Sequence, residues 1–466
     1  MTGVPGIREV RAALRHGELS ATDHVRAALT GIAERDRELG AFVAVAGERA
    51  LAEAEAADRM IRALGPQAWE QKPLLGITVS VKDLIQTADL PTTRGSLLPN
   101  LRASVDAPAV GRLRTAGAIV IGKTTTSEYG WCASTVSRVA AATRNPWSAG
   151  RSAGGSSGGA AVSVAGGMCA AALGTDGAGS IRIPAAFCGV VGFKPSHGRV
   201  PYVPACADRL AHLGPLTRSV ADARELTALM GGAHPDDPDS GFTAEHSYPG
   251  RLRIGWMEFP GTSPEVRRIT EDALPVLAAL GHRVEPIEVP FPDPQAALID
   301  IIAAAEAAGT APEDESHCDE GRLAVVRHGR TVSGAAVARA EEVRMALRIR
   351  LHAVMRRYDL LVMATVPIEP YAVDAIGPDW ATDPADLLWL AWTPATYPFN
   401  LTGQPAISFP AGTTADGLPV GLQLVGPVGG DELVLSVAAA AEAALGTMPD
   451  PFSGSAREPV LPVATG

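Results

Sequence analysis

The hydrophobic pattern changes its period along the chain. From Ile7 to Leu64 apolar residues recur every three or four positions, and Ser20 is a candidate N-cap, so this stretch is predicted to be helical. We expect residues 41–63 to continue as an Ala-rich helix. Residues 1–70 are therefore predicted to form an N-terminal helical layer.

Beyond this layer the apolar residues form short β-branched runs. Leu74–Val81 and Ala118–Ile121 are two such runs, and the helical stretch Val110–Ala116 lies between them. A strand, helix, strand order predicts parallel strands covered by helices. We therefore expect an α/β fold, specifically an α/β/α sandwich on a central mixed, mostly parallel β-sheet.

Residues 145–180 are dense in glycine and serine, a composition typical of flexible linkers. An Ala/Val pattern at Gly159–Ala172 interrupts this stretch and predicts a helix. The stretch then closes on Ser-Ile-Arg-Ile-Pro, which begins at Ser180. A loop, a helix and a second loop are therefore predicted here.

The second half of the chain alternates between Pro- and Asp-rich helical stretches and further strand patterns. Strands are predicted at Leu252–Trp256, Leu360–Ala364, Ala406–Phe409 and Leu418–Val425, and a last helix at Glu432–Leu445.

We expect a single domain over residues 1–466. Residues 71–231 and 396–450 are predicted to form its catalytic core, and residues 232–395 a variable, substrate-shaping region packed on that core.

Composition narrows the classes of function. The formal net charge of −11 disfavours a nucleic-acid groove, which needs clustered Lys and Arg, and the Arg-rich stretch Arg344–Arg357 has the spacing of a helix face. No window has the roughly 18 apolar residues of a membrane span. The five cysteines are an odd number without metal-type CxxC spacing, which indicates free thiols and a cytoplasmic protein.

Three features together can cleave an amide, which requires an activated nucleophile, a proton for the leaving amine and donors for the oxyanion. The small residues Gly177–Ser180 let backbone N–H groups converge on one cavity. Ser156 lies in Gly154–Gly159, where glycines permit unusual backbone conformations. Lys82 ends an apolar strand, where burial favours the neutral amine.

Each feature alone has an ordinary explanation. A Gly-rich loop before a helix more often binds phosphate or simply turns, and a lysine at a strand end is usually solvated. From the residues alone, neither motif decides between these explanations and catalysis.

Taken together, the motifs make the chain resemble the amidase signature family over most of its length. Ser180 follows Ser156 by 24 residues, which is the family's spacing. The matching stretches are Gly76–Asp83, Gly122–Gly130, Asn145–Trp147, Gly154–Gly159, Gly174–Pro184, Gly189–Gly198, Gly214–Arg218, Asn400–Pro410 and Gly417–Pro427.

The resemblance implies an amidase that forms an acyl-enzyme and needs no cofactor or metal. It implies that Ser180 is the nucleophile and that Ser156, in a cis peptide, passes the proton to neutral Lys82. The residues implied to bind the substrate or its oxyanion are Gly130, Gly177, Ala178 and Gly179, with Asp176 and Arg182 as a supporting ion pair.

One position departs from the family pattern. Ala178 stands where the family usually has glycine. An alanine keeps the backbone N–H, but a positive φ there would cost about 1 kcal/mol, and the methyl group would narrow the site.

Other candidate residues have stronger structural interpretations. The acidic stretch with Asp314, Glu315, His317, Asp319 and Glu320 can be drawn as a metal site, but such clusters are typically solvated surface. We interpret Cys132 as a packed thiol and His197 as a turn residue. The aromatic residues Trp380, Trp389, Trp392 and Tyr397 point either to an aryl-binding pocket or to core packing.

Three rival functions remain at this stage. The same three residues can transfer an acyl group to an amine, or serve a glutaminase subunit of a tRNA-dependent transamidase; a catalytically dead binding protein is disfavoured because all three are present. The expected partner is a small-molecule amide, with no direct contact to nucleic acid or membrane. A homodimer is only the statistical expectation.

Overall fold

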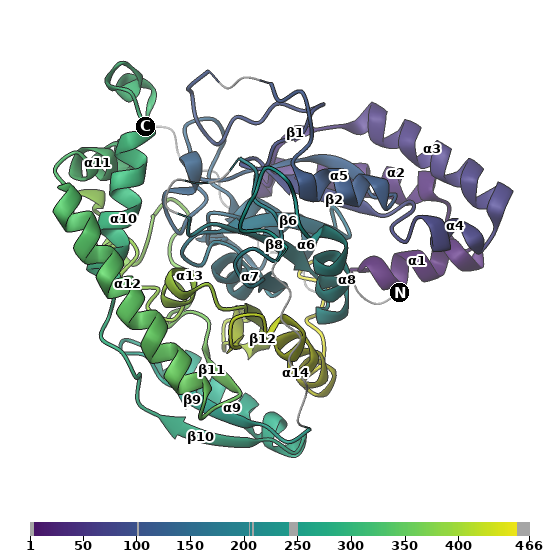
Figure 1. Ribbon diagram of the computed structural model, residues 1–466. Helices are drawn as coiled ribbons and strands as arrows, with labels where there is room; N and C mark the ends of the chain where they lie inside the picture. Colours follow the sequence, from purple (N-terminus) through teal and green to yellow (C-terminus); the bar gives the residue numbers. More distant parts are fainter. Residues whose placement is uncertain (1–3, 100–101, 205, 207–208, 242–249, 454–466) are drawn as a thin grey trace.

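A computed structural model describes residues 4–99, 102–204, 206, 209–241 and 250–453 (Figure 1). The two ends of the predicted domain, residues 1–3 and 454–466, lie outside the described residues. None of the helices in this described part has the length and apolar character of a membrane span.

One large sheet runs through the molecule. Its eleven strands follow the spatial order β1-β3-β2-β6-β8-β7-β12-β13-β11-β9-β10. They are β1 (Phe42–Val45), β2 (Thr78–Lys82), β3 (Ile119–Thr124), β6 (Ala171–Asp176), β7 (Val191–Lys194), β8 (His212–Thr217), β9 (Arg253–Met257), β10 (Arg283–Ile287), β11 (Leu360–Ala364), β12 (Ala406–Thr413) and β13 (Pro419–Val425). A separate hairpin pairs β4 (Arg144–Asn145) with β5 (Ser148–Ser152).

The sheet is mixed, as predicted, but six of its ten strand pairings are antiparallel, so parallel pairing is not the majority. Parallel pairing occurs in two blocks, β3-β2-β6 and β11-β9-β10, and the strands between these blocks are antiparallel. Between the parallel neighbours β2 and β3 the chain forms α5 (Pro108–Thr115), which confirms the predicted strand, helix, strand unit.

The helices vary from one turn to the long α12. They are α1 (Ile7–His16), α2 (Ala21–Leu39), α3 (Gly47–Leu64), α4 (Gln67–Gln71), α6 (Gly158–Ala165), α7 (Arg182–Cys188), α8 (Val220–Met230), α9 (Pro264–Ala279), α10 (Gln295–Ala308), α11 (Glu320–Gly329), α12 (Gly334–Met355), α13 (Pro398–Thr402) and α14 (Asp431–Leu445). Figure 1 shows α2 and α3 on one side of the molecule and α10, α11 and α12 on the opposite side.

Helices cover both faces of the sheet. In β12, Ala406 packs in the apolar cluster that contains Phe187 of α7, whereas its neighbour Ile407 packs in the cluster that contains Val434 of α14. Consecutive residues of a strand point to opposite faces, so α7 and α14 lie on opposite sides. This is the expected α/β/α sandwich.

Two element predictions are wrong. Residues 41–63 are not one helix, because Phe42–Val45 form β1 and pair with β3 at the edge of the sheet, so the N-terminal layer is not purely helical. The helix predicted at Gly159–Ala172 ends at Ala165, and Ala171 begins the fully buried strand β6. In both places alanine favours a helix, but sheet pairing and burial override that weak preference.

The region expected to pack on the core is partly built into the sheet. Its strands β9, β10 and β11 form one end of the central sheet, whereas α10, α11 and α12 pack together beside it. Residues 232–395 therefore share the sheet that carries the motif-rich strands.

Candidate active site

Strand topology brings the motif residues to one edge of the sheet. β2 and β6 are parallel neighbours, and the carboxyl ends of parallel strands meet at the same edge. Lys82 is the last residue of β2 and Thr175 lies near the end of β6. Ser156 lies in the loop before α6, and Ser180 in the loop between β6 and α7.

Lys82 is fully buried and contacts hydroxyl groups. Its Nζ lies 2.7 Å from Ser156 Oγ and 2.9 Å from Thr175 Oγ1. Burial lowers the pKa of the Lys82 amine to about 7, although the charge of Asp176 acts in the opposite direction. Near neutral pH a large share of Lys82 is therefore the neutral amine, which can accept a proton.

The loop that carries Ser156 needs its glycines. The peptide bond between Gly155 and Ser156 is cis. A Cβ on Gly155 would lie 2.2 Å from the carbonyl oxygen of Ser134, so any side chain there would clash with backbone. Gly154 has a positive φ of 73°. These two constraints explain why glycines precede Ser156.

Ser180 and Ser156 line the same cavity. This cavity has a volume of about 320 Å³, and Ser180 is 9% exposed. The Ser157 N–H donates to the Ser180 carbonyl oxygen at 3.1 Å, which joins the two loops. A direct hydrogen bond between the hydroxyls of Ser156 and Ser180 is not among the contacts of the described residues.

The backbone before Ser180 offers fewer donors than the sequence predicts. The Gly179 N–H donates to Asp176 Oδ1 at 2.7 Å, so it is already engaged. For the N–H groups of Gly177, Ala178 and Ser180, the described part of the chain provides no acceptor. These three N–H groups, and not that of Gly179, are available to an oxyanion.

Ala178 does not have a positive φ. The described non-glycine residues with positive φ are Arg94, Tyr129, Arg209 and Leu387, so Ala178 lies outside the left-handed region. Gly179 takes the positive φ instead, at 129°. An alanine at 178 therefore keeps its N–H without the cost of a positive φ, and Ala178 lines the cavity.

Asp176 and Arg182 form the predicted ion pair beneath this loop. Arg182 Nε and Nη2 each donate to one Asp176 oxygen at 2.9 Å, and both residues are fully buried. Burial alone would raise the pKa of Asp176, but Arg182 outweighs it and holds this pKa well below its usual value. The pair positions the Gly177–Ser180 loop and does not line the cavity.

Asn400 completes this support, although sequence analysis gave it no role. Its Nδ2 donates to Asp176 Oδ1 at 2.9 Å, and its Oδ1 accepts from Arg182 Nη2 at 2.6 Å. Asn400 begins the matching stretch Asn400–Pro410, so a signal was present. Thr175, the second contact of Lys82, likewise lies within a matching stretch.

The cavity walls combine an aromatic side with a charged side. Trp131 and Trp389 pack edge to face, with ring centroids 5.4 Å apart, and Ile302 and Leu390 extend the apolar surface. The charged lining residues are Arg94, Glu306 and Arg322, and none of them was singled out from the sequence.

The other candidates from the sequence fall in different places. Gly130 and Cys132 line the cavity, and burial raises the pKa of the Cys132 thiol to about 12, so it remains a thiol. Trp389 lines the cavity, Trp392 and Tyr397 are buried, and Trp380 is 58% exposed. None of the five cysteines, all of which lie in the described part of the chain, forms a disulfide, as predicted.

Side chains of the acidic stretch form a helix cap and an ion pair. Asp319 caps α11 with its side chain, and its N–H donates to buried Glu128. Glu315 pairs with Arg330. Among the described residues, no group of three His, Cys, Asp or Glu side chains has a metal-binding arrangement. His197 lies in a turn, where its N–H donates to Gly403.

Comparisons with known proteins agree over nearly the whole chain. The family model described as Amidase matches residues 23–435. A glutamyl-tRNA(Gln) amidotransferase subunit of Thermus thermophilus is 37% identical and covers 94% of this chain and 96% of its own length. Putative amidase AmiA2 of Mycobacterium tuberculosis is 36% identical, covering 95% of this chain and 94% of its own.

A solved structure of this family has a similar fold. A bacterial aryl acylamidase of the amidase signature enzymes has a TM-score of 0.84 and 27% sequence identity to this chain. The alignment covers 95% of this chain and 96% of the aryl acylamidase chain.

Proposed function

Because the chain belongs to the Amidase family, we propose that Lys82, Ser156 and Ser180 hydrolyse a linear carboxylic amide to an acid and an amine through an acyl-enzyme. The observation that carries this proposal is the 2.7 Å contact of Lys82 Nζ with Ser156 Oγ. It couples a lysine with a pKa of about 7 to a hydroxyl in the same cavity as Ser180.

Acylation begins with attack on the amide carbonyl carbon. The Ser180 Oγ forms the new C–O bond while its proton passes to Ser156 Oγ, and the Ser156 proton passes to neutral Lys82 Nζ. The carbonyl oxygen becomes an oxyanion, and the N–H groups of Gly177, Ala178 and Ser180 stabilise it. Lys82 then carries the proton as an ammonium group.

Breakdown reverses the flow of the proton. Ser156 protonates the leaving nitrogen, Lys82 returns its proton to Ser156, and the C–N bond breaks to release the amine. The acyl group remains as an ester on Ser180. Water then attacks this ester with the same three residues, which releases the acid and regenerates the free hydroxyl.

The test is a substrate panel with a serine variant. Aliphatic, aryl and amino-acid amides are incubated with wild-type protein, and released amine and acid are quantified. Ser180→Ala should abolish turnover and leave the fold intact, because only one hydroxyl is lost. Ser148→Ala, a matched change in β5 outside the cavity lining, should keep wild-type turnover.

Hydroxylamine provides a direct readout of the acyl-enzyme. When it is added with the substrate, wild-type protein should form a hydroxamate and Ser180→Ala should form none. Turnover by Ser180→Ala close to the wild-type rate would refute the assignment of the nucleophile.

A second candidate is a glutaminase that works with a tRNA-binding partner. The 37% identity to an amidotransferase subunit favours it. In that case glutamine should be the preferred amide in the panel, and ammonia release should rise when the tRNA-binding partner is added. Hydrolysis of aryl amides in preference to glutamine, without any partner, would exclude it.

A further inference from the structure

Among the described residues, one of the two arginines that line the catalytic cavity has no carboxylate partner. Of its charged lining residues, Arg322 pairs with Glu306 at 2.8 Å and also donates to Thr310 and Cys318. The Arg94 guanidinium, by contrast, has no carboxylate or hydrogen-bond acceptor within the described part of the chain. The charged side chains that line the cavity therefore sum to one positive charge, in a protein whose formal net charge is −11.

Arg94 is held in place by a closely anchored loop. Its N–H donates to the Asp83 carbonyl oxygen at 3.0 Å, and Asp83 directly follows Lys82. The neighbouring Thr93 donates its N–H to the Asp83 carboxylate, and Ser96 donates to buried Glu128 at 2.5 Å. These contacts fix the Arg94 backbone relative to the end of β2.

The Arg94 side chain projects from an uncommon backbone conformation. Its φ is +59°, and Tyr129, whose N–H donates to the Arg94 carbonyl oxygen, has a φ of +52°. Left-handed backbone at non-glycine residues costs energy and clusters at functional sites. Here the two residues are adjacent and both line the catalytic cavity.

Both guanidinium groups lie near the Tyr129 ring. The Arg322 guanidinium lies 4.2 Å from the centre of the Tyr129 ring, and that of Arg94 lies 5.5 Å from it. The Arg322 side chain is almost fully buried and its charge is neutralised by Glu306, so it is part of the cavity wall. Arg94 is half-buried, so a ligand in the cavity can reach its N–H donors.

From this geometry, and resting on the proposed amidase function, we propose that Arg94 binds a carboxylate carried by the substrate. An unpaired, preorganised guanidinium matches a carboxylate with two parallel hydrogen bonds. The cavity surface formed by Trp131 and Trp389 binds an apolar or aryl part of the same molecule. The favoured substrate class is thus an amide that bears both an apolar group and a carboxylate.

Two series of anilides test this proposal and locate the carboxylate. In the first, 4-nitroanilides of glutaric, adipic and pimelic acid are compared with analogues in which an isopropyl group replaces the terminal carboxylate. In the second, acetanilides carry either a carboxylate or an isopropyl group at the para position of the leaving aniline. The readout is the ratio of kcat/KM for the carboxylate over its uncharged isostere.

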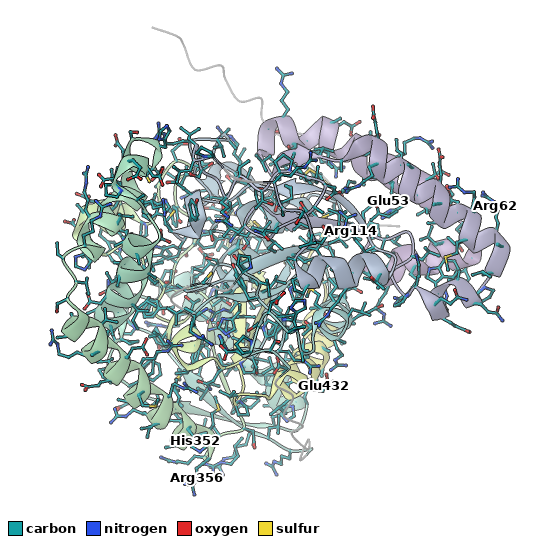
Figure 2. The ribbon with its side chains drawn as sticks, turned by 45° about the horizontal axis from the view of Figure 1, so that its top comes forward. Glu53, Arg62, Arg114, His352, Arg356 and Glu432 are labelled. Carbon is teal, nitrogen blue, oxygen red and sulfur yellow. The ribbon has the colours of Figure 1, made fainter. Side chains whose placement is uncertain are left out.

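In Arg94→Gln this ratio should fall about 10- to 100-fold in one of the two series, because the substrate carboxylate loses a charged hydrogen-bond partner. Arg94→Lys should retain part of the ratio, because lysine keeps the positive charge but lacks the two parallel N–H donors of the guanidinium group. High salt should lower the wild-type ratio. Arg62→Gln removes the same charge from the outer helix α3 (Figure 2) and should keep the wild-type ratio.

The outcomes separate the two proposals. A ratio that is equal in wild type and Arg94→Gln in both series overturns the role of Arg94. A failure of every anilide, charged or neutral, to give Ser180-dependent turnover counts instead against the proposed amidase function.

Discussion

Two buried lysines lie near the carboxyl ends of the neighbouring strands β2 and β3, and their side-chain partners differ. Lys82 of β2 contacts the hydroxyls of Ser156 and Thr175. Lys123 of β3 lies 3.5 Å from the carboxylate of Asp83 and donates to Thr92. Burial lowers the pKa of both amines, to about 7 for Lys82 and about 8 for Lys123.

From the different partners of the two lysines we infer different roles, one in catalysis and one in the scaffold. A carboxylate partner keeps a buried ammonium charged and makes it part of the scaffold. Hydroxyl partners compensate a charge poorly, so the amine loses its proton near neutral pH and can act as a base. On this account Lys82 supplies chemistry and Lys123 holds the loop that follows β2.

The largest effect is expected from Lys82→Met, which removes the base. We expect kcat/KM to fall by about 10²- to 10⁴-fold, the usual contribution of general base catalysis. Steady-state kinetics and thermal unfolding of the same sample measure this, and folding should be retained. A Lys82→Met rate within a few-fold of wild type would remove the distinction between the two lysines.

Lys123→Met should show the opposite behaviour. It leaves the buried Asp83 carboxylate without its cation, which typically costs about 3–5 kcal/mol of unfolding free energy. Urea unfolding measures the loss, and activity per folded molecule should stay within a few-fold of wild type. Adding Asp83→Asn should recover part of the stability. Unchanged stability with lost activity would place Lys123 in the chemistry.

The smallest of these effects is expected from Thr175→Val. This change keeps the side-chain shape but removes one of the two hydroxyls at Lys82, worth about 0.5–1.5 kcal/mol. We expect kcat/KM to fall about tenfold or less. Thr227→Val, which removes a buried hydroxyl from α8, is the matched control and should leave kcat/KM unchanged. Equal losses in both variants would indicate a general packing effect.

Much of the sheet could be predicted, because unbroken β-branched runs report buried strands directly. Leu360–Ala364 forms β11 with the predicted bounds. The strands β2 and β3 overlap the predicted runs Leu74–Val81 and Ala118–Ile121, although both strands begin and end later than those runs. β1 and β6 could not be predicted, since Phe42–Val45 is short and Ala171–Asp176 begins with alanines. Only long-range pairing makes these segments strands.

The candidate site likewise contains features that the sequence predicts and features that depend on the three-dimensional structure. The positions of Lys82, Ser156 and Ser180 follow from motif spacing and from the parallel pairing of β2 with β6. The engaged N–H of Gly179 could not be predicted, because it depends on how the Asp176 carboxylate turns back onto its own loop. Arg94 comes from a loop without periodicity, so its place beside the cavity appears only in three dimensions.

The pH dependence of kcat/KM tests the central claim most directly. If neutral Lys82 is the base, activity of the wild type on a neutral amide must rise with pH through a midpoint near 7 and then level off, because protonation below this pKa removes the acceptor. Lys82→Met should lose this step, and Lys123→Met should keep it. A wild-type profile that is flat between pH 5 and 9, or a step that survives in Lys82→Met, would contradict the account.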